Sequence, residues 1–285
     1  DVKDFTIEWL DKLLRENKIK FIKWDMNRYI AEAGWPDADP AMQRELRIRY
    51  IDNLYYILKT IREKHPTVVF ETCSGGGGRS NYGMLQYTDQ IWTSDNTNVG
   101  DRLQIQYGFS HAFPAKVMVN WVTDEAWYGE NPSLRFRLLV SMAGNLGIGS
   151  NLHLWNDKDK AIAREMIALY KEIRPIIQFG DVYRIGDPLS EDRCAFQYVS
   201  RDRSHSVLFV YQTQPSIRDA VSGSRCIVLH GLDLDAEYQV FGDIETEIAR
   251  GKTLLSGGLS VPLQGSWDGK LIRLEKTTAD QEEKQ

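Results

Sequence analysis

The chain has 285 residues, of which 42% are hydrophobic, so it can bury a large core in one or two domains. A formal net charge of −5, with no basic run, argues against a nucleic-acid-binding surface. No run of about 18 apolar residues occurs, so the sequence predicts no membrane-spanning helix.

The first part of the chain alternates between helix and strand patterns. Apolar residues at helical spacing predict helices over 4–17, 41–64, 100–111, 133–143 and 157–179, the last interrupted near Pro175. Short apolar runs predict strands at 19–24, 67–70, 90–93, 116–121 and 145–154. This α/β order indicates a parallel sheet, and polar clusters that follow the strands favour part of a (β/α)₈ TIM barrel over residues 1–179. A doubly wound open sheet is less favoured, because the G-x-G-x-x-G phosphate fingerprint is missing.

The pattern changes after about residue 180. Short alternating segments separated by Gly, Asp and Ser turns predict an antiparallel β-sandwich domain over residues 180–276. Residues 277–285 are a polar tail. The predicted strands in this region are 195–199, 206–211, 225–229, 237–241, 260–263 and 271–274.

Cysteine and histidine usage limits the kinds of site that the chain can carry. Three scattered cysteines are too few for a disulfide framework and favour a reducing, cytoplasmic compartment. No Cys/His cluster has metal-ligand spacing, so we expect neither a metal nor an organic cofactor.

Two predicted strands end in an aspartate beside a tryptophan. Asp25 directly follows the predicted strand 19–24, within the segment Lys23-Trp24-Asp25-Met26-Asn27-Arg28, and Asp95 follows Trp92-Thr93-Ser94. An isolated strand-end aspartate usually caps the next helix or turn. A pair of them with a glycine run in between points instead to glycoside chemistry, in which one carboxylate attacks the anomeric carbon and the other transfers protons.

Four ordered motifs resemble a known family. The Lys-Trp-Asp-Met-Asn-Arg segment, Cys73-Ser-Gly-Gly-Gly-Gly-Arg79, Trp92-Thr-Ser-Asp95 and Arg102-Leu-Gln-Ile-Gln-Tyr-Gly108 are similar to those of the bacterial α-galactosidases (melibiases) of glycoside hydrolase family 36. The resemblance covers about residues 1–178. It implies retaining hydrolysis of terminal α-linked galactose, as in raffinose or melibiose, on barrel strands four to eight.

The same resemblance implies a role for each site residue. Asp25 would be the nucleophile and Asp95 the acid/base, while Lys23 and Asn27 would contact sugar hydroxyls. Cys73 and Gly76 would line the space around the 2-position substituent, and we also count Trp92 among the substrate-binding residues. Retention of Cys73 favours galactose over the 2-acetamido sugar of the related α-N-acetylgalactosaminidases.

Elementary chemistry agrees with these assignments. Lys23 lies two residues from Asp25 on the same strand face, so we expect it to lower the pKa of that carboxylate. An acid/base needs desolvation, and Trp92 is a candidate apolar wall for Asp95. The glycine run would lie between the two aspartates, where a side chain would collide with a closely approaching ligand.

Several other residues could carry part of the chemistry. Asp124 is a second candidate acid/base, and Glu71 is a candidate buried partner of the site. Catalysis by the Cys73 thiol is disfavoured, because no histidine is close in sequence. Asp101 and Arg102 are expected to cap or pair on a helix surface, and Trp121, Trp127 and Trp155 either stack on sugars or pack in the core.

The chain also departs from the family pattern. Only strands four to eight of the expected barrel are recognisable, so we interpret the sequence as the C-terminal portion of a larger enzyme or as a chain that another polypeptide completes. The full-length protein is expected to be a homo-oligomer. A non-catalytic carbohydrate-binding remnant is the alternative. Sequence alone does not separate these, because both retain Asp25 and Asp95.

Overall fold

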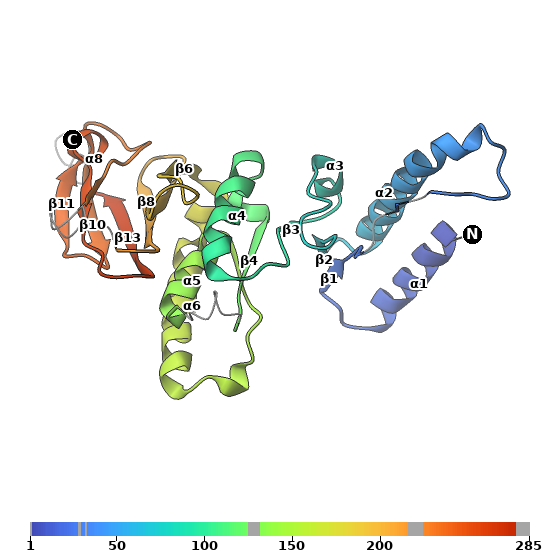
Figure 1. The fold of residues 1–285 in the computed structure, drawn as a ribbon, viewed down its shortest axis with the longest axis horizontal. Coiled ribbons are helices and arrows are strands. Elements are labelled where there is room, and N and C mark those ends of the chain that lie inside the picture. Colours follow the sequence, from blue (N-terminus) through green and yellow to red (C-terminus); the bar gives the residue numbers. More distant parts are fainter. Residues whose placement is uncertain (1, 28–29, 32, 125–131, 216–224, 278–285) are drawn as a thin grey trace, which may run out of the picture. The chain divides into compact units, whose positions relative to one another are not determined.

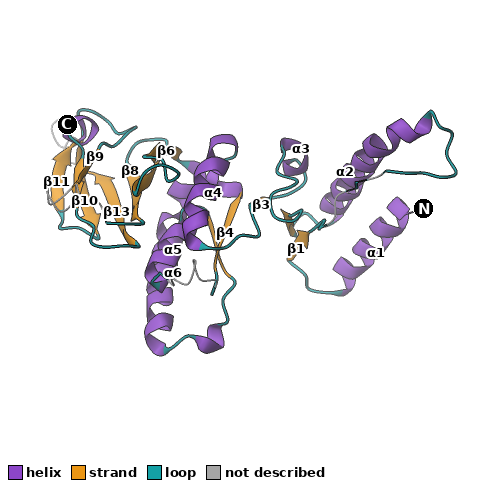
Figure 2. Ribbon diagram, in the orientation of Figure 1, coloured by secondary structure: helices purple, strands orange, loops and turns teal. Residues whose placement is uncertain are grey.

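Helices and strands alternate along the first two thirds of the chain, and strands dominate the last third (Figures 1 and 2). The computed structural model describes residues 2–27, 30–31, 33–124, 132–215 and 225–277. The chain divides into two compact units, residues 1–95 and 96–285. Arg28 of the Lys-Trp-Asp motif, Trp127, which was expected to stack on a sugar or pack in the core, and nearly all of the polar tail lie outside the described residues.

Unit 1 is a small parallel sheet covered by two helices. Strands β1 (Phe21–Trp24), β2 (Val69–Thr72) and β3 (Gln90–Trp92) pair in parallel, with Lys23 opposite Glu71 and Thr72 opposite Ile91. Helix α1 (Val2–Glu16) precedes β1, α2 (Leu46–Lys64, after a 3₁₀ turn at Met42–Glu45) connects β1 to β2, and the short α3 (Tyr82–Leu85) lies between β2 and β3. Helices α1 and α2 pack side by side (Figure 1). The core of unit 1 includes Leu10, Leu14, Leu54, Leu58, Ile61, Phe70 and Met84.

Unit 2 begins with helices around a second parallel pair. Helix α4 (Val99–Ala112) and a 3₁₀ turn (Ala115–Val117) lead into β4 (Met118–Val122), which pairs in parallel with β5 (Asn145–Ile148). Helix α5 (Leu134–Met142) connects these strands and is capped by the Ser133 hydroxyl. A 3₁₀ turn (Leu152–Leu154) then precedes α6 (Asp157–Phe179), which starts with a capping box between Asn156 and Asp159.

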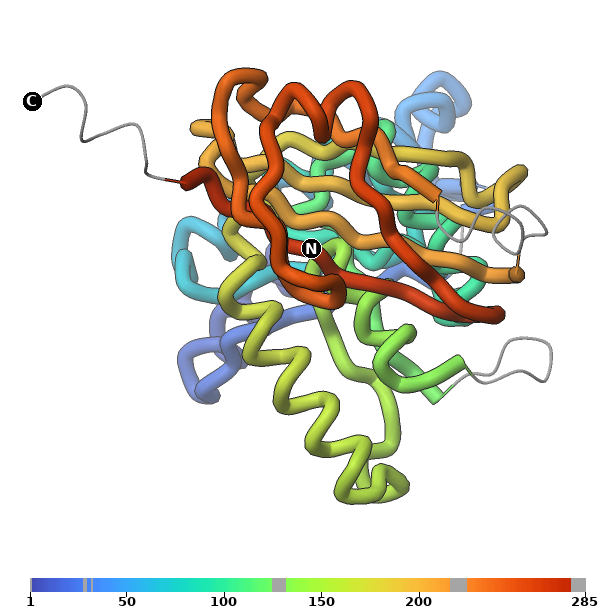
Figure 3. The backbone as a smooth tube through the Cα atoms, turned by 90° about the vertical axis from the view of Figure 1, so that its left-hand side faces the viewer, coloured from blue at the N-terminus to red at the C-terminus, as the bar shows by residue number. Residues whose placement is uncertain are grey.

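An antiparallel sheet makes up most of the remainder of unit 2 (Figure 3). Its six strands lie in the order β11-β10-β13-β8-β7-β6, and a separate two-stranded sheet pairs β12 with β9. Helix α8 (Gly251–Ser256) precedes β12. The strands are β6 (Asp181–Ile185), β7 (Arg193–Val199), β8 (His205–Gln212), β9 (Arg225–Ile227), β10 (Glu237–Gly242), β11 (Glu247–Arg250), β12 (Leu259–Val261) and β13 (Asp268–Lys276).

The large antiparallel sheet packs on both faces. One face contributes Phe196, Tyr198, Phe209 and Tyr211 to a core that also contains side chains of α5 and α6. The opposite face packs in a second core with β9, β12 and α8. The last helices of the parallel region and the antiparallel domain therefore share one core.

The elements agree with the sequence-based predictions in type and differ in extent. The expected interruption at Pro175 is wrong: α6 is continuous, and Pro175 lies on its exposed side, where water can satisfy the carbonyl that lacks an N–H partner. Strand β2 starts at Val69 because residues 65–68 form a turn, with Val68 N donating to His65 O at 3.1 Å. Strand β5 ends at Ile148 instead of continuing to residue 154, and strands β6 and β11 were not predicted.

Candidate active site

Asp25 directly follows strand β1, in a segment that continues to form backbone hydrogen bonds with the segment after β2. Cys73 N donates to Trp24 O at 3.0 Å, and Met26 N donates to Cys73 O at 3.1 Å. Both peptide groups that flank the Asp25 side chain are therefore bonded to the neighbouring strand. Because side chains alternate along a strand, Lys23 and Asp25 share one face while Trp24 points to the other.

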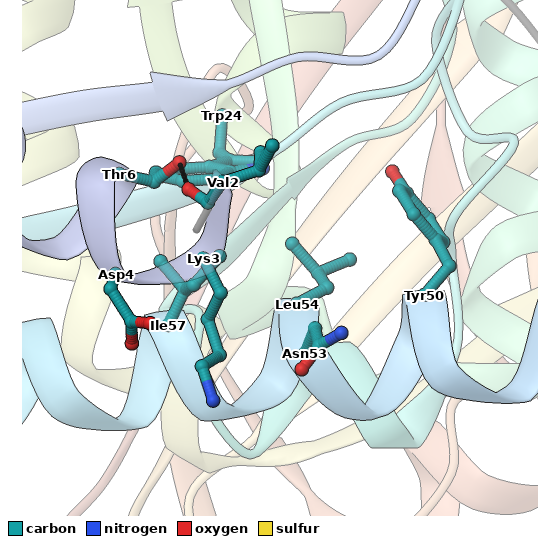
Figure 4. Close-up of a pocket in the computed structure, with 9 residues that line it drawn as sticks. All are labelled: Val2, Lys3, Asp4, Thr6, Trp24, Tyr50, Asn53, Leu54 and Ile57. Carbon is teal, nitrogen blue, oxygen red and sulfur yellow. Dashed lines mark hydrogen bonds between the residues drawn. The ribbon is translucent and has the colours of Figure 1, made fainter.

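Trp24 faces the helical layer rather than the aspartates. It lines a cavity of about 370 Å³ between α1 and α2, together with Tyr50 and Leu54 (Figure 4). None of the predicted site residues lines this cavity. The candidate site therefore lies on the opposite face of β1 from the cavity.

The Asp25 carboxylate is exposed but well supplied with donors. Partial desolvation opposes its ionisation, yet hydrogen bonds from Cys73, Asn27 and Met26 N–H, with attraction from Lys23, outweigh it and lower its pKa below the ordinary 3.8. The predicted direction is confirmed. The cause is corrected, because attraction by Lys23 is a smaller contribution than the hydrogen bonds.

Lys23 is held mainly by two other residues. Its Nζ lies 3.6 Å from Glu71 Oε1 and 4.5 Å from the centre of the Trp92 ring, so it contacts both β2 and β3. Glu71 is only 1% exposed and also accepts from Gln90 Nε2 at 2.6 Å. Burial raises the pKa of Glu71 even though Gln90 and Lys23 favour its ionised form. Glu71 therefore fits the expected buried partner and is too enclosed to attack a ligand.

Cys73 contacts the candidate nucleophile. The thiol is 2% exposed, and burial together with its hydrogen bond to Asp25 raises the pKa of Cys73 to about 11. The sulfur is therefore protonated near neutrality and acts as a donor to Asp25. This agrees with the sequence-based view that Cys73 is no catalytic thiol.

The glycine run packs against the backbone beside Asp95. Gly76 has φ +80°, and a Cβ there would lie 2.8 Å from Ser94 Cα and 2.9 Å from Asp95 N. On its other side the loop contacts the β1 extension, since Gly75 N donates to Asn27 Oδ1 at 3.3 Å. The loop therefore lies between the segments of the two aspartates, as predicted. The close neighbour that requires glycine at position 76 is protein backbone.

Trp92 contacts Asp95 through its polar edge. The indole Nε1 donates to Asp95 Oδ1 at 2.8 Å, and Trp92 is 3% exposed while Asp95 is exposed. The expectation that Trp92 would form an apolar wall that desolvates Asp95 is therefore wrong for this structure. The hydrogen bond fixes the orientation of the carboxyl group instead.

The other candidates have structural partners. Asp124 accepts from Asn151 N at 2.7 Å, and Asp101 accepts from Asn96 Nδ2 at 2.6 Å. Trp155 is buried in the core of unit 2. The Trp121 ring packs directly over Gly147 and Gly149, where the Cβ of any larger residue would collide with it. The surface position predicted for Arg102 is wrong, because it is 2% exposed and donates to Val119 O and Asn120 Oδ1.

One residue of the site was missed in the sequence. Arg79 ends the glycine motif, is 7% exposed and donates to two backbone carbonyls of the site. Its place directly after the glycine run was the available signal. Among the described residues no group of three or more His, Cys, Asp or Glu side chains could hold a metal ion, and no helix there is long and apolar enough to cross a membrane.

Comparison with known proteins assigns both parts of the chain. The melibiase family model matches residues 1–180, and the model of the glycosyl hydrolase family 36 C-terminal domain matches residues 193–274. Alpha-galactosidase AgaA of Geobacillus stearothermophilus is 35% identical over 268 residues, which are 93% of this chain and 36% of that protein. Alpha-galactosidase 2 of Hypocrea jecorina is 35% identical over 281 residues, 98% of this chain and 36% of that protein.

Solved structures agree with the sequence relatives. A variant of Geobacillus stearothermophilus AgaA in complex with raffinose is 33% identical and superimposes with a TM-score of 0.90, over 97% of this chain and 38% of that one. Another variant, in complex with stachyose, has a TM-score of 0.91 at 33% identity, with the same two coverages. The chain thus spans little more than a third of the length of these relatives. The family match covers more than half of the chain itself, and the chain belongs to the melibiase family of glycoside hydrolases.

Proposed function

We propose that the protein containing this chain is a retaining α-galactosidase that removes terminal α-linked galactose from oligosaccharides of the raffinose and stachyose type. The observation that carries the proposal is the arrangement around Gly76. Asp25 and Asp95 follow strands on either side of β2, and the glycine loop after β2 touches the Asn27 side chain and the Asp95 backbone. The raffinose and stachyose complexes of AgaA variants support the substrate class.

Asp25 is proposed as the nucleophile. Its pKa is lowered, so the carboxylate is ionised near neutrality and can attack the anomeric carbon as the glycosidic bond breaks. This step forms a covalent glycosyl–Asp25 ester and leaves the aglycone as an alkoxide in need of a proton. The donors that surround Asp25 also favour its return as a leaving group in the second step.

Asp95 is proposed as the acid/base. It gives its proton to the departing glycosidic oxygen, then takes a proton from the water that attacks the anomeric carbon and releases Asp25. The indole N–H of Trp92 holds one carboxyl oxygen, which leaves the other available for proton transfer. A retaining enzyme places its two carboxyl groups about 5–5.5 Å apart, and we propose that separation in the substrate-bound protein.

The remaining residues are proposed to bind the sugar. Lys23, fixed between Glu71 and the Trp92 ring, presents its ammonium to galactose hydroxyls, and Asn27 does the same beside the glycine loop. Cys73 and Gly76 form the wall near the 2-position. Cys73 at this wall is the basis for proposing galactose, a 2-hydroxyl sugar, rather than a 2-acetamido sugar.

The finer architecture is part of the proposal. We assign β1 to β5 to strands four to eight of a (β/α)₈ barrel over residues 1–179, and residues 180–276 to a β-sandwich that covers the barrel flank and contributes to oligomer contacts. The free thiols of Cys73, Cys194 and Cys226 support a reducing, cytoplasmic location.

The test uses the complete natural protein. An aryl α-galactoside should be hydrolysed with retention, and Asp25→Ala should abolish turnover. Added azide should then restore some turnover and give the inverted β-galactosyl azide, because the small anion occupies the space of the missing carboxylate. Full activity of Asp25→Ala would refute the nucleophile, and faster cleavage of an aryl α-N-acetylgalactosaminide would identify the alternative enzyme. A wild-type protein that binds galactose without turnover would identify a binding remnant.

A further inference from the structure

Arg79 joins the backbone of the two segments that hold the proposed nucleophile. Its Nη2 donates to Trp24 O at 2.8 Å and to Cys73 O at 2.7 Å, so one nitrogen spans β1 and β2 just past their ends. Trp24 O is the carbonyl directly before Asp25. Cys73 O is the acceptor of Met26 N, the amide directly after Asp25. Arg79 is therefore bonded, directly or through Cys73, to both peptide groups that flank Asp25.

The Arg79 guanidinium is buried, and burial of a charged group costs free energy that packing alone does not explain. Only 7% of the residue is exposed, and burial lowers its pKa, although Tyr50, Asp25 and Cys73 attract its positive charge. A charged group is expensive to bury unless it is paired and hydrogen-bonded. Arg79 donates to two backbone carbonyls and also interacts with the Tyr50 side chain, and no carboxylate of the described residues forms an ion pair with it. These contacts point to a role in shaping the backbone.

We propose that Arg79 is a positioning residue that fixes the Asp25 carboxylate for attack on the anomeric carbon. This inference rests on the proposed function, because it presumes that Asp25 is the nucleophile. Arg79 touches no reacting atom and acts through the Trp24 carbonyl and the Met26 amide. We call the two hydrogen bonds from Arg79 Nη2 to Trp24 O and Cys73 O the clamp. Its loss removes two of the ties that hold the segment around Asp25, and a displacement of Asp25 by about 1 Å lowers the rate about 100-fold.

Unit 1 offers a matched control at the other end of its sheet. Arg62 makes a two-pronged contact with Asp89, at 2.7 and 3.0 Å, and Asp89 accepts from Phe70 N near the start of β2. Arg62→Met removes a guanidinium from the same unit without touching the site. Arg79→Lys keeps the charge of Arg79 and, with its point-like ammonium, can hold the carbonyls only in part.

The main experiment compares these variants in the complete natural protein. Arg79→Met should lower kcat on an aryl α-galactoside by about 100-fold and leave KM within about threefold, Arg79→Lys should fall in between, and Arg62→Met should match the wild type. A KM effect without a kcat effect would overturn the inference. If Arg79→Met does not fold, Arg79→Lys with wild-type kcat would overturn it equally.

A second measurement separates positioning from general structural damage. In the Asp25→Ala background azide replaces the carboxylate as the nucleophile, so no side chain remains for Arg79 to position. Adding Arg79→Met should therefore change the azide-dependent rate by less than about twofold. An equal loss in both backgrounds would show that Arg79 acts independently of Asp25.

A third measurement does not depend on activity. Hydrogen exchange of the segment 24–27 should be faster in Arg79→Met and unchanged in Arg62→Met, because only the former loses the clamp. Unchanged exchange in Arg79→Met overturns the inference. A wild-type protein without α-galactosidase activity, but with this exchange pattern, would refute the proposed function and leave the clamp in place.

Discussion

The carboxyl ends of β1 to β3 in unit 1 and the tyrosine-lined face of the antiparallel sheet in unit 2 use polar groups in opposite ways. At the strand ends, Asp25 and Asp95 remain exposed while donors gather round them. On the sheet face, Tyr198 and Tyr211 are fully buried, and their hydroxyls donate to Ala143 O at 2.7 Å and Leu139 O at 3.0 Å. The first arrangement leaves carboxylate oxygens accessible to a ligand. In the second, both tyrosine hydroxyls donate to carbonyls at the C-terminal end of α5 and so join the sheet to that helix. Changes in the first should therefore alter activity, and changes in the second should alter stability.

The glycine loop gives the largest expected effect. Gly76→Ala puts a methyl group within 3 Å of the Ser94 and Asp95 backbone at a positive φ, so the loop beside Asp95 must shift. We expect kcat/KM of the whole protein to fall at least about 100-fold. Gly75→Ala is the control, because its φ is +51° but a Cβ would meet nothing within 4 Å; only about 1–2 kcal/mol of stability should be lost. Equal activity losses would mean that conformation, and not contact with Asp95, requires glycine.

Removing one tyrosine hydroxyl tests the other region. Tyr198→Phe leaves the buried Ala143 carbonyl without this donor, so the free energy of unfolding should fall by about 1–3 kcal/mol while kcat and KM stay unchanged. Denaturant unfolding measures the change, with Tyr56→Phe on an exposed helix face as the control. A Tyr198→Phe protein that keeps its stability but loses activity would break the contrast between the regions.

The pH profile sharpens the account of Asp25. The pKa of Asp25 is lowered, so its side chain is ionised at every pH above the ordinary value of 3.8. It becomes protonated only when the pH falls through the lowered pKa. Protonation of Asp25 should therefore cause no decrease of kcat/KM above about pH 4. Cys73→Ala removes the strongest of the hydrogen bonds that lower this pKa and should move the acid limb to higher pH, whereas Cys226→Ala should not. An acid limb that moves down in Cys73→Ala would contradict the assignment.

Alkylation of the accessible thiol is expected to have the smallest effect on activity. Cys226 is exposed, whereas Cys73 and Cys194 are buried and burial raises their pKa values to about 11 and about 12. Iodoacetamide at pH 8 should modify Cys226 first and leave activity intact, as followed by peptide mass mapping. Rapid modification of Cys73 with early loss of activity would show that the site is more open than its contacts indicate.

Much of the layout could be predicted from the sequence, since apolar periodicity depends on local spacing. The strands that carry Asp25 and Asp95, the glycine loop between them and the antiparallel region all follow from such patterns. Long-range partners do not. The burial of Arg102 depends on Asn120, and that of Arg79 on Trp24, 55 positions earlier. Arginine is so rarely buried that composition argues for the surface in both cases. Strand β6 was missed because its pairing with β7, rather than its own short sequence, makes it a strand.

The shared core of α5, α6 and the antiparallel sheet also has a consequence for recombining homologous enzymes. A crossover at Gly180 looks natural in the sequence, yet it would join helices of one parent to a sheet of another across a single close-packed interior. Tyr198 and Tyr211 would come from one parent and the helix α5 carbonyls that accept their hydrogen bonds from the other. The two residues of the Arg135–Asp243 ion pair, 2.6 Å apart, would likewise come from different parents. Chimeras that keep residues 96–277 from one parent preserve all of these contacts and are the ones expected to express as folded protein.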